Sequence, residues 1–275
     1  MNYRHAYHAG NHTEVFKHSV LCLLIAELLK KSTPITVLDT HAGAGQYDLL
    51  SPEAQKTKEY SEGIGTAINR QVPSASIYLD IVRNLNPAAL TRYPGSPSIV
   101  RRLLRNDDRM IACELRRVDF VRLYDQFKDD RRVSVHCRDG YEAIRALVPL
   151  ASRRGLVFVD PPFERTDEFE LLAKGMKGGA SKWPTGMFAA WYPIKDRIGS
   201  RSIRKKFDAS DPPVLCCEFL REPIDGVRLA GSGMLICNPP WRFEEKLSLL
   251  CKDLSVALDA PTAESVIEWW VRERN

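Results

Sequence analysis

Short apolar runs alternate along the chain with longer segments that mix apolar and polar residues. Each run is rich in Val, Ile, Leu or other apolar residues and predicts a buried strand of a parallel sheet. The runs lie at 35–39, 109–113, 132–136, 155–159 and 186–191. Strands that alternate with helices in this way indicate an α/β fold.

The two ends of the chain depart from this alternation. Asn11, with Glu14 three residues later, resembles a capping box and predicts a helix that continues to about Lys31. Its apolar face is formed by Phe16, Val20, Leu24 and Leu28. Farther along, apolar runs at 214–220 and 233–237 are separated by a loop without a helical pattern, so we expect an antiparallel hairpin there.

Residues 51–92 also interrupt the alternation. They are rich in charge, carry no strong strand signal and are longer than a connection in an αβ unit needs to be. We therefore expect a small helical insertion at 51–92 within a single domain that spans residues 1–275.

Acidic residues stand at or just beyond the ends of several predicted strands. They are Asp39, Glu114, Asp139 and Asp160. Any one of them is more often a helix cap or a solvated loop residue, but together, at one edge of a parallel sheet, they favour a cofactor crevice. The acid after the second strand of such a sheet commonly binds ribose hydroxyls, which points to Glu114, and Asp139 after the third could meet an adenine amino group.

The last of these acids opens an unusual tetrapeptide, Asp160-Pro161-Pro162-Phe163. An exocyclic amine such as adenine N6 is scarcely nucleophilic, because its lone pair is delocalised into the ring. Asp160 could accept one N–H of such an amine and the Pro161 carbonyl the other, while Phe163 offers a face on which a base can stack. The alternative is a proline-rich turn that the aspartate merely caps.

A glycine-rich turn follows the first predicted strand. After Asp39, Gly43 and Gly45 stand at alternate positions, which lets the backbone approach a ligand closely. The dinucleotide fingerprint G-x-G-x-x-G is incomplete, because Asp48 occupies the position of its third glycine, and this disfavours a nicotinamide enzyme. The turn suits S-adenosylmethionine, whose charged amine Asp39 can meet; a tight structural turn is the alternative.

Composition narrows the class of protein. With 275 residues, 44% of them hydrophobic, the chain can bury a large core, and its net charge of +5 is compatible with a polyanionic partner. The seven cysteines lack C-x-x-C spacing, which disfavours a disulfide framework or a zinc site. Because the sequence shows neither a membrane-spanning segment nor a signal peptide, we expect a soluble, cytoplasmic protein.

The chain also carries a series of specific short motifs. They are residues 3–12 (YRHAYHAGNH), 17–18 (KH), 38–45 (LDTHAGAG), 59–64 (EYSEGI), 93–97 (YPGSP), 160–163 (DPPF), 191–193 (WYP) and 238–241 (NPPW). In this order they resemble the RlmJ family, bacterial methyltransferases that place one methyl group on N6 of a particular adenine in 23S ribosomal RNA. The resemblance covers essentially the whole chain, and Phe163, where many relatives carry Tyr, preserves the stacking face.

The resemblance implies a class I S-adenosylmethionine-dependent methyltransferase with a Rossmann-like fold. It also implies that Tyr3 and His5 lie over the substrate pocket with Lys17 beside it, and that the cofactor is contacted by His18, His41 and Ser96. The expected cofactor site then comprises His18, Asp39, His41, Gly43, Gly45, Ser96, Glu114, Asp139, Gly140 and Asp160. The expected catalytic residues are Asp160, Pro161 and Phe163.

Residues 1–10 are dense in aromatic and imidazole rings and have no apolar periodicity. Cysteine partners at zinc-ligand spacing are missing, so we expect no metal. We expect this segment to close over the pocket when cofactor or substrate binds, with Tyr3 on or near an adenine that has left its stack.

Basic residues gather between 195 and 206, within one predicted helix. They are Lys195, Arg197, Arg201, Arg204, Lys205 and Lys206. They could neutralise RNA phosphates or form an ordinary solvated helix face. The expected substrate site comprises Tyr3, His5, Lys17, Arg201 and Arg204. We expect 23S ribosomal RNA as the partner of a monomeric protein.

A second proline pair, Asn238-Pro239-Pro240-Trp241, follows the last predicted strand. N-P-P-aromatic is itself a methyltransferase motif, but the cofactor-side strand ends are already occupied. We interpret this pair as a strand terminator whose Trp241 packs on the core or lines the base pocket.

Other functions compete with methylation of ribosomal RNA. A DNA adenine methyltransferase also carries D-P-P-aromatic, but usually with a larger recognition domain. A nucleic-acid-binding protein that has lost catalysis would not need Asp39, Glu114 and Asp160 intact. N-methylation of glutamine uses N-P-P-aromatic, and the acid of Asp160 disfavours it.

Overall fold

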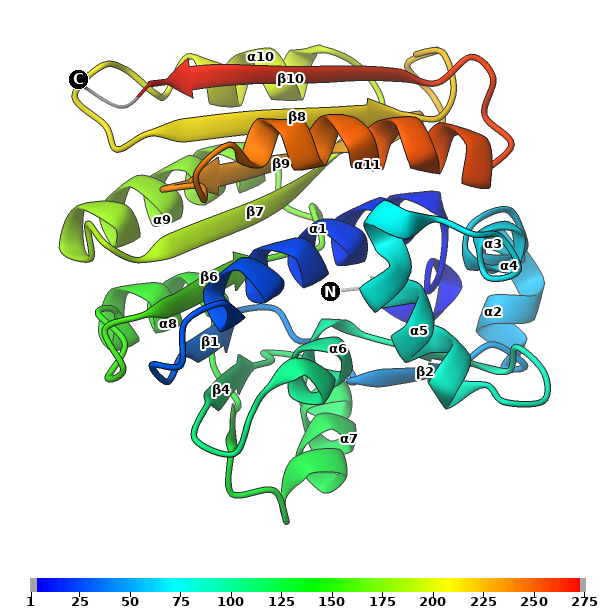
Figure 1. The fold of residues 1–275 in the computed structure, drawn as a ribbon, viewed down its shortest axis with the longest axis horizontal. Coiled ribbons are helices and arrows are strands. Elements are labelled where there is room, and N and C mark those ends of the chain that lie inside the picture. Colours follow the sequence, from blue (N-terminus) through cyan, green and yellow to red (C-terminus); the bar gives the residue numbers. More distant parts are fainter. Residues whose placement is uncertain (1–3, 273–275) are drawn as a thin grey trace.

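The computed structural model describes residues 4–272, and an eight-stranded sheet with the order β10-β8-β9-β7-β6-β1-β4-β5 forms its centre (Figure 1). Its parallel block consists of β1 (Thr36–Asp39), β4 (Arg109–Cys113), β5 (Val133–His136), β6 (Gly155–Val159) and β7 (Met187–Ile194). Antiparallel pairing adds β8 (Val214–Leu220), β9 (Gly231–Cys237) and β10 (Glu264–Val271).

The strands form where the apolar runs predict them. All residues of β1 and β6 are buried, as expected for strands that are covered on both faces. The predicted hairpin is present as β8 paired with β9, although β9 begins at Gly231, two residues before the predicted start. The prediction of an α/β fold with a terminal antiparallel hairpin is confirmed.

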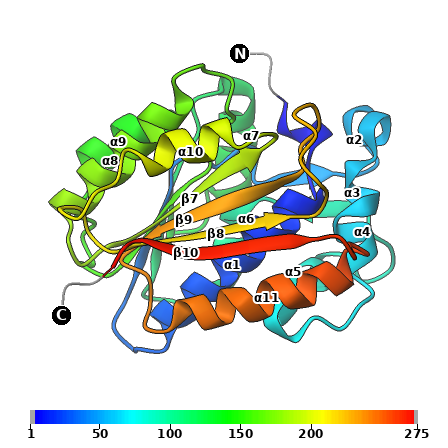
Figure 2. The ribbon, with the colours of Figure 1, turned by 90° about the horizontal axis from the view of Figure 1, so that it is seen from above.

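Helices cover both faces of the sheet (Figure 2). One face carries α1 (His12–Leu29), α5 (Ser76–Leu85), α6 (Ser96–Leu103), α7 (Arg117–Phe127) and α11 (Phe243–Ala257). The other carries α8 (Gly140–Leu147), α9 (Glu168–Lys182) and α10 (Ile198–Arg204). Each face therefore has a hydrophobic core of its own.

Helix α1 is more deeply buried than its sequence suggests. The predicted apolar residues Phe16, Val20 and Leu24 are fully buried, and so are the polar Lys17 and His18 on the same helix. The cause is its position, since α1 contacts β9 and is flanked by α5, α6 and α11. Charged side chains of α1 are thereby held inside the protein.

The N-terminus of α1 carries only half of the predicted capping box. The side chain of Asn11 accepts a hydrogen bond from the Glu14 amide at 3.0 Å, which makes Asn11 the N-cap. The Glu14 carboxylate does not return to Asn11; it pairs with Lys17 and His5.

The segment between β1 and β4 holds several short helices. They are α2 (Pro52–Thr57), α3 (Glu59–Glu62), α4 (Ile64–Ala67), the 3₁₀ turn η2 (Pro73–Ala75) and then α5. A small antiparallel ribbon of β2 (Gln46–Asp48) and β3 (Arg92–Pro94), which the sequence did not reveal, flanks them. The boundaries of an insertion at 51–92 within one domain stay a prediction.

The basic helix predicted at 195–206 is shorter than expected. Only Ile198–Arg204 is helical, as α10. Arg197 precedes the helix, and its guanidinium pairs with the buried carboxylate of Glu218 on β8. Lys205 and Lys206 follow the helix, so the basic residues do not share one helical face.

The predicted environment of Trp241 is wrong. Because β9 runs antiparallel to β7, Asn238 lies at the sheet edge opposite to Asp160. The Asn238 amide donates to the carbonyls of Pro184 at 2.9 Å and Gly186 at 2.7 Å. This fits a strand terminator, but Trp241 is 85% exposed and contributes neither to the core nor to the cleft described below.

Candidate active site

The carboxyl ends of the parallel strands border a cleft with a volume of about 960 Å³. Its walls also include the N-terminal segment, α1, α3 and the loop between β8 and β9. The predicted site residues that line it are His5, Lys17, His18, His41, Gly43, Ser96, Glu114, Asp139, Gly140, Asp160, Pro161 and Phe163. Outside the lining lie Asp39, Gly45, Arg201 and Arg204, whereas Tyr3 lies outside the described residues.

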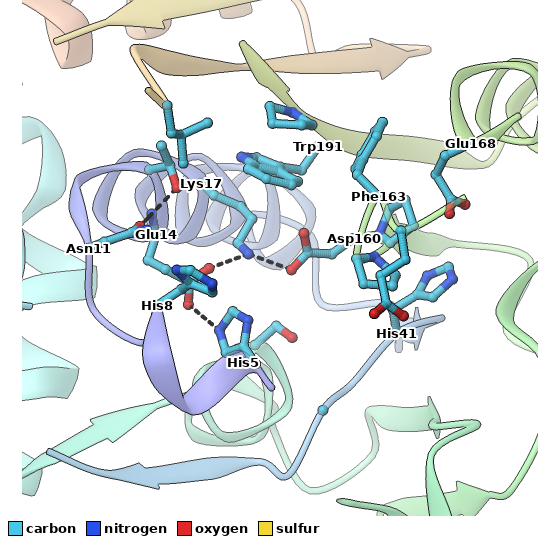
Figure 3. A pocket seen from close by; sticks show the side chains of 18 of the residues that line it. His5, His8, Asn11, Glu14, Lys17, His41, Asp160, Phe163, Glu168 and Trp191 are labelled. Carbon is cyan, nitrogen blue, oxygen red and sulfur yellow. Dashed lines mark hydrogen bonds and ion pairs between the residues drawn. The ribbon is translucent and has the colours of Figure 1, made fainter. Parts of the chain in front are cut away.

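The side chain of Asp160 projects from the end of β6 toward the ammonium group of Lys17, with which it pairs (Figure 3). One turn earlier on α1, Glu14 pairs with the same ammonium. The other Glu14 oxygen lies 2.9 Å from His5 Nε2. A continuous row of polar side chains thus links the N-terminal segment to the Asp160–Phe163 tetrapeptide.

Burial and charge shift the pKa values within this row. Burial raises the pKa of Asp160, and Lys17 opposes this rise without cancelling it. Burial alone would lower the pKa of Lys17, but the carboxylates of Asp160 and Glu14 outweigh it and raise that pKa. Burial likewise acts to raise the pKa of Glu14, which Lys17 and His5 instead hold well below its usual value. Of the two carboxylates, Asp160 is therefore the one whose charge is less stabilised.

Aromatic side chains form the wall next to Asp160. The ring of Phe163 lies 4.8 Å from that of Phe169 and 5.8 Å from that of Trp191. The Lys17 ammonium lies 5.1 Å above the Trp191 ring. Phe163 has a backbone φ of 50°, an uncommon conformation for a bulky residue that the surrounding fold must enforce. The wall offers flat apolar surface beside a carboxylate.

The N-terminal segment lies against the insertion at the other side of the cleft. Its 3₁₀ turn η1 spans His5–Tyr7, and His8 Nδ1 lies 3.0 Å from the Glu59 carboxylate of α3. Gly63 packs so closely on this segment that a Cβ there would lie 2.1 Å from the Gly10 carbonyl oxygen. Closure of the segment as a lid stays a prediction.

Two of the predicted acids face the cleft while bonding to the backbone. Glu114 accepts hydrogen bonds from the amides of Gly43 at 2.9 Å and Arg116 at 2.6 Å. Burial raises the pKa of Glu114. Asp139 accepts from the Glu142 amide at 2.9 Å and is the N-cap of α8. For Asp139 the alternatives of helix cap and cleft residue are therefore both true.

Glycines allow the loops after β1 and β5 to lie against each other. Gly43 and Gly45 have φ values of 61° and 81°, which favour glycine. A Cβ on Gly140 would lie 2.4 Å from the Thr40 carbonyl oxygen. Gly45 itself faces away from the cleft, where a Cβ would meet the side chain of Gln126. Its part in the site is thus conformational.

Asp39 lies beneath the cleft instead of in its wall. Its side chain is fully buried, and burial raises its pKa to about 7, against the opposing effects of the Ser96 hydroxyl and the His41 amide. A contact between Asp39 and a ligand amine stays a prediction. Its carboxyl group is poised to titrate near neutral pH.

Sequence reasoning missed several residues of the cleft. Glu14 was interpreted only as a cap, although its spacing of three from Lys17 on a helix is typical of an ion pair. Trp191 stood in a motif without an assigned role. Arg221 and Arg228, which had no assigned role, also line the cleft, and so does Lys195 of the predicted basic group, whereas Arg201 and Arg204 do not. The RNA-binding role of Arg201 and Arg204 stays a prediction.

Within residues 4–272, no group of three or more His, Cys, Asp or Glu side chains is arranged to hold a metal ion. In the same range, no helix is both long and apolar enough to cross a membrane.

Comparison with known proteins identifies the family of this chain. Residues 32–271 match the family model described as "Ribosomal RNA large subunit methyltransferase D, RlmJ". The chain belongs to this family. It is 36% identical to ribosomal RNA large subunit methyltransferase J of Escherichia coli K12, over 99% of this chain and 100% of that protein. It is 37% identical to the protein of the same name from Haemophilus influenzae, over 98% of each chain.

A solved structure shares the fold of this RlmJ-family chain. It is the crystal structure of a protein from Legionella pneumophila str. Philadelphia 1, with a TM-score of 0.86 and 31% sequence identity. The match covers 95% of this chain and 98% of the other. The resemblance inferred from the short motifs is thereby confirmed over nearly the full length, and the chain is a methyltransferase with a Rossmann-like fold.

Proposed function

We propose that this enzyme transfers a methyl group from S-adenosylmethionine to N6 of one specific adenine in 23S ribosomal RNA. The observation that carries the proposal is the environment of Asp160. Its partly buried carboxylate lies in the cleft beside Pro161 and an aromatic wall, at the end of a strand, in a family of ribosomal RNA methyltransferases. This arrangement suits a planar base with an exocyclic amine.

The cleft has the chemical character that the cofactor requires. Among the described residues, ten acidic and six basic side chains line it, which favours a ligand with a sulfonium and an ammonium group. Each oxygen of Glu114 accepts one backbone N–H and keeps a lone pair for a ribose hydroxyl. When bound, S-adenosylmethionine supplies an electrophilic methyl group. We assign its binding to His18, His41, Gly43, Ser96, Glu114, Asp139, Gly140 and Asp160, with Asp39 and Gly45 shaping the site from behind.

In this proposal Asp160 and Pro161 orient the target amine. The carboxylate accepts one N–H and the carbonyl the other, so that the lone pair of N6 points toward the methyl group. As N6 gains positive charge, Asp160 stabilises it, and the effect is strong because burial leaves the charge of Asp160 poorly satisfied beforehand. Lys17 holds the carboxylate in place and stays protonated.

The aromatic wall binds the target base, and the mouth of the cleft binds the RNA backbone. A target adenine must leave its stack to reach Asp160, and Phe163 and Trp191 replace the lost stacking. The acidic lining disfavours phosphates inside the cleft. The phosphate backbone of the RNA is therefore expected to stay at the mouth of the cleft, near the exposed Lys195 and Arg228.

The test is methyl transfer to 23S ribosomal RNA isolated from cells that lack the gene. We expect the purified enzyme to restore one N6-methyladenosine, detected by mass spectrometry of nuclease digests, and the Asp160→Asn variant to do so about 10²–10³-fold more slowly. Duplex DNA with the same sequence tests the competing function. Methylation of the duplex at an equal or higher rate would reject RNA as the substrate.

A further inference from the structure

Behind the cleft, His18 is connected to two buried tyrosines. His18 Nδ1 lies 2.8 Å from the Tyr93 hydroxyl, which lies 3.0 Å from the Tyr78 hydroxyl. The two tyrosines are fully buried and His18 is 1% exposed. The tyrosines come from β3 and α5, so the row reaches from the insertion to a residue that lines the cleft. Tyr93 opens the YPGSP motif, of which only Ser96 has a role in the proposed cofactor site.

The histidine is neutral, and the proton can therefore lie on either ring nitrogen. Burial lowers the pKa of His18 to about 3, although Glu14 acts to raise it. In one arrangement Tyr78 donates to Tyr93, Tyr93 donates to His18 Nδ1, and Nε2 carries the proton. In the reverse arrangement Nδ1–H donates to Tyr93 and Tyr93 donates to Tyr78.

The two arrangements differ in the hydroxyl hydrogen of Tyr78. Within residues 4–272, Tyr78 hydrogen-bonds to Tyr93 alone, so in the reverse arrangement its buried hydrogen points to no acceptor in that range. A buried donor without a partner costs about 1–3 kcal/mol. Glu14 favours a proton on Nδ1, but its nearest oxygen is 4.0 Å away and already bonds to His5. The first arrangement leaves no hydroxyl hydrogen without an acceptor.

We propose that Tyr93 and Tyr78 are positioning residues that fix His18 with its proton on Nε2, as a hydrogen-bond donor toward the cofactor end of the cleft. The direction toward the cofactor rests on the proposed function, whereas the tautomer rests on the hydrogen bonds alone. The ligand atom that fits is an acceptor without hydrogen, such as a carboxylate oxygen. The hydrogen bonds of Tyr78 and Tyr93 to His18 Nδ1 would thus determine that Nε2 binds a ligand as a donor.

The tautomer is tested on the ligand-free protein by long-range ¹H–¹⁵N NMR of ¹⁵N-histidine, with the His18 signals assigned by loss in His18→Gln. We expect a protonated Nε2 and a bare Nδ1 in the wild type. A wild-type spectrum in which the His18 proton lies on Nδ1 overturns the proposal. In Tyr93→Phe, which removes the hydroxyl bonded to Nδ1, we expect the Nδ1–H tautomer to become populated. In Tyr78→Phe the Nε2–H tautomer should persist, because the reverse arrangement would leave the Tyr93 hydrogen without an acceptor.

The consequence for binding is tested by calorimetry with S-adenosylhomocysteine. Tyr93→Phe should weaken binding about five- to tenfold, the loss of roughly one directed hydrogen bond, and Tyr78→Phe should weaken it less. Tyr124→Phe, at a half-exposed position on α7 outside the cleft lining, is the matched control and should not change it. Unchanged affinity in a folded Tyr93→Phe overturns the positioning role. If the wild type has the expected tautomer but methylates no RNA, the proposed function fails while the hydrogen-bond assignment stands.

Discussion

The two edges of the sheet carry similar residues for opposite purposes. At the carboxyl edge of the parallel strands, Asp160 is followed by two prolines and an aromatic that face the cleft. At the opposite edge, Asn238 is followed by the same pattern, but its amide holds two backbone carbonyls and Trp241 projects into solvent. Strand direction decides between the two, because β9 runs against the parallel block. The edge of the sheet at which such a motif lies therefore determines whether it faces the cleft.

The two edges also differ in the pKa of a fully buried carboxyl group, Asp108 at one edge and Asp39 at the other. Asp108, just before β4, accepts hydrogen bonds from the Ile35 amide at 2.9 Å and from Arg105. Burial acts to raise its pKa, but Arg105 and these amides outweigh it and lower the pKa. Asp39, at the end of β1, has its pKa raised to about 7 by burial. At the opposite edge the ionised form of Asp108 is stabilised, whereas at the cleft edge burial destabilises the ionised form of Asp39.

The largest effect is expected at the cleft edge. Asp160→Asn should reduce methyl transfer by about 10²–10³-fold, because an amide cannot stabilise positive charge on N6. Affinity for S-adenosylhomocysteine should stay within about threefold of wild type, within the spread of a minor contact. A radiolabelled methyl assay and titration calorimetry measure the two.

The matched variant at the other edge is Asn238→Ala. It removes hydrogen bonds to Pro184 and Gly186 and should lower the melting temperature while transfer per folded molecule is unchanged. A loss of transfer in this variant as large as that in Asp160→Asn would abolish the distinction between the edges.

The next effect concerns stability at the opposite edge. Asp108→Asn should cost on the order of 3 kcal/mol of unfolding free energy, because the amide turns donor hydrogens toward Arg105 and buried N–H groups. The exposed neighbour Asp107→Asn is the control. Denaturant unfolding should show the difference at neutral pH. Since the folded pKa of Asp108 is lowered, this stabilisation is present above about pH 4 and is lost as the pH falls further.

A comparison of the two aromatic residues gives an intermediate effect. Phe163→Ala should reduce kcat/KM for RNA by about 10–100-fold, since base stacking on an aromatic side chain contributes about 1–3 kcal/mol. Trp241→Ala should change it by less than about twofold, as for a surface substitution away from the site. Steady-state kinetics with ribosomal RNA fragments separate them. Equal effects would mean that Trp241 also contacts RNA.

The smallest effect is a gain in stability. The pKa of Asp39 is higher in the folded chain than in the unfolded one, so its ionisation costs stability as the pH rises from about 4 to about 7, and the loss is complete above that. Asp39→Asn should therefore raise the melting temperature at pH 8 and have little effect at pH 4. Thermal scans at both values test this. A variant that is less stable at pH 8 would show that the ionised carboxylate is well satisfied.

The sequence predicted the features that depend on short stretches of chain. The strands ending at Asp39, Cys113 and Val159 follow from local apolar runs, and the fold class follows from their alternation. The pairing of Lys17 with Asp160 joins residues that are 143 positions apart, so no local pattern contains it. The environment of Trp241 was mistaken because strand direction is a property of the whole sheet.

The burial of α1 has a consequence for how the chain is made. This helix packs against β9 and α11, which the ribosome produces long after it. Until then α1 can pack on α5, α6 and β6, and Lys17 can pair with Glu14 on its own helix, but the side of α1 that faces β9 and α11 lacks its apolar cover. The helix that carries Lys17 is therefore fully packed only after β9 and α11 have been made, and a nascent chain interrupted before β9 is expected to carry no activity.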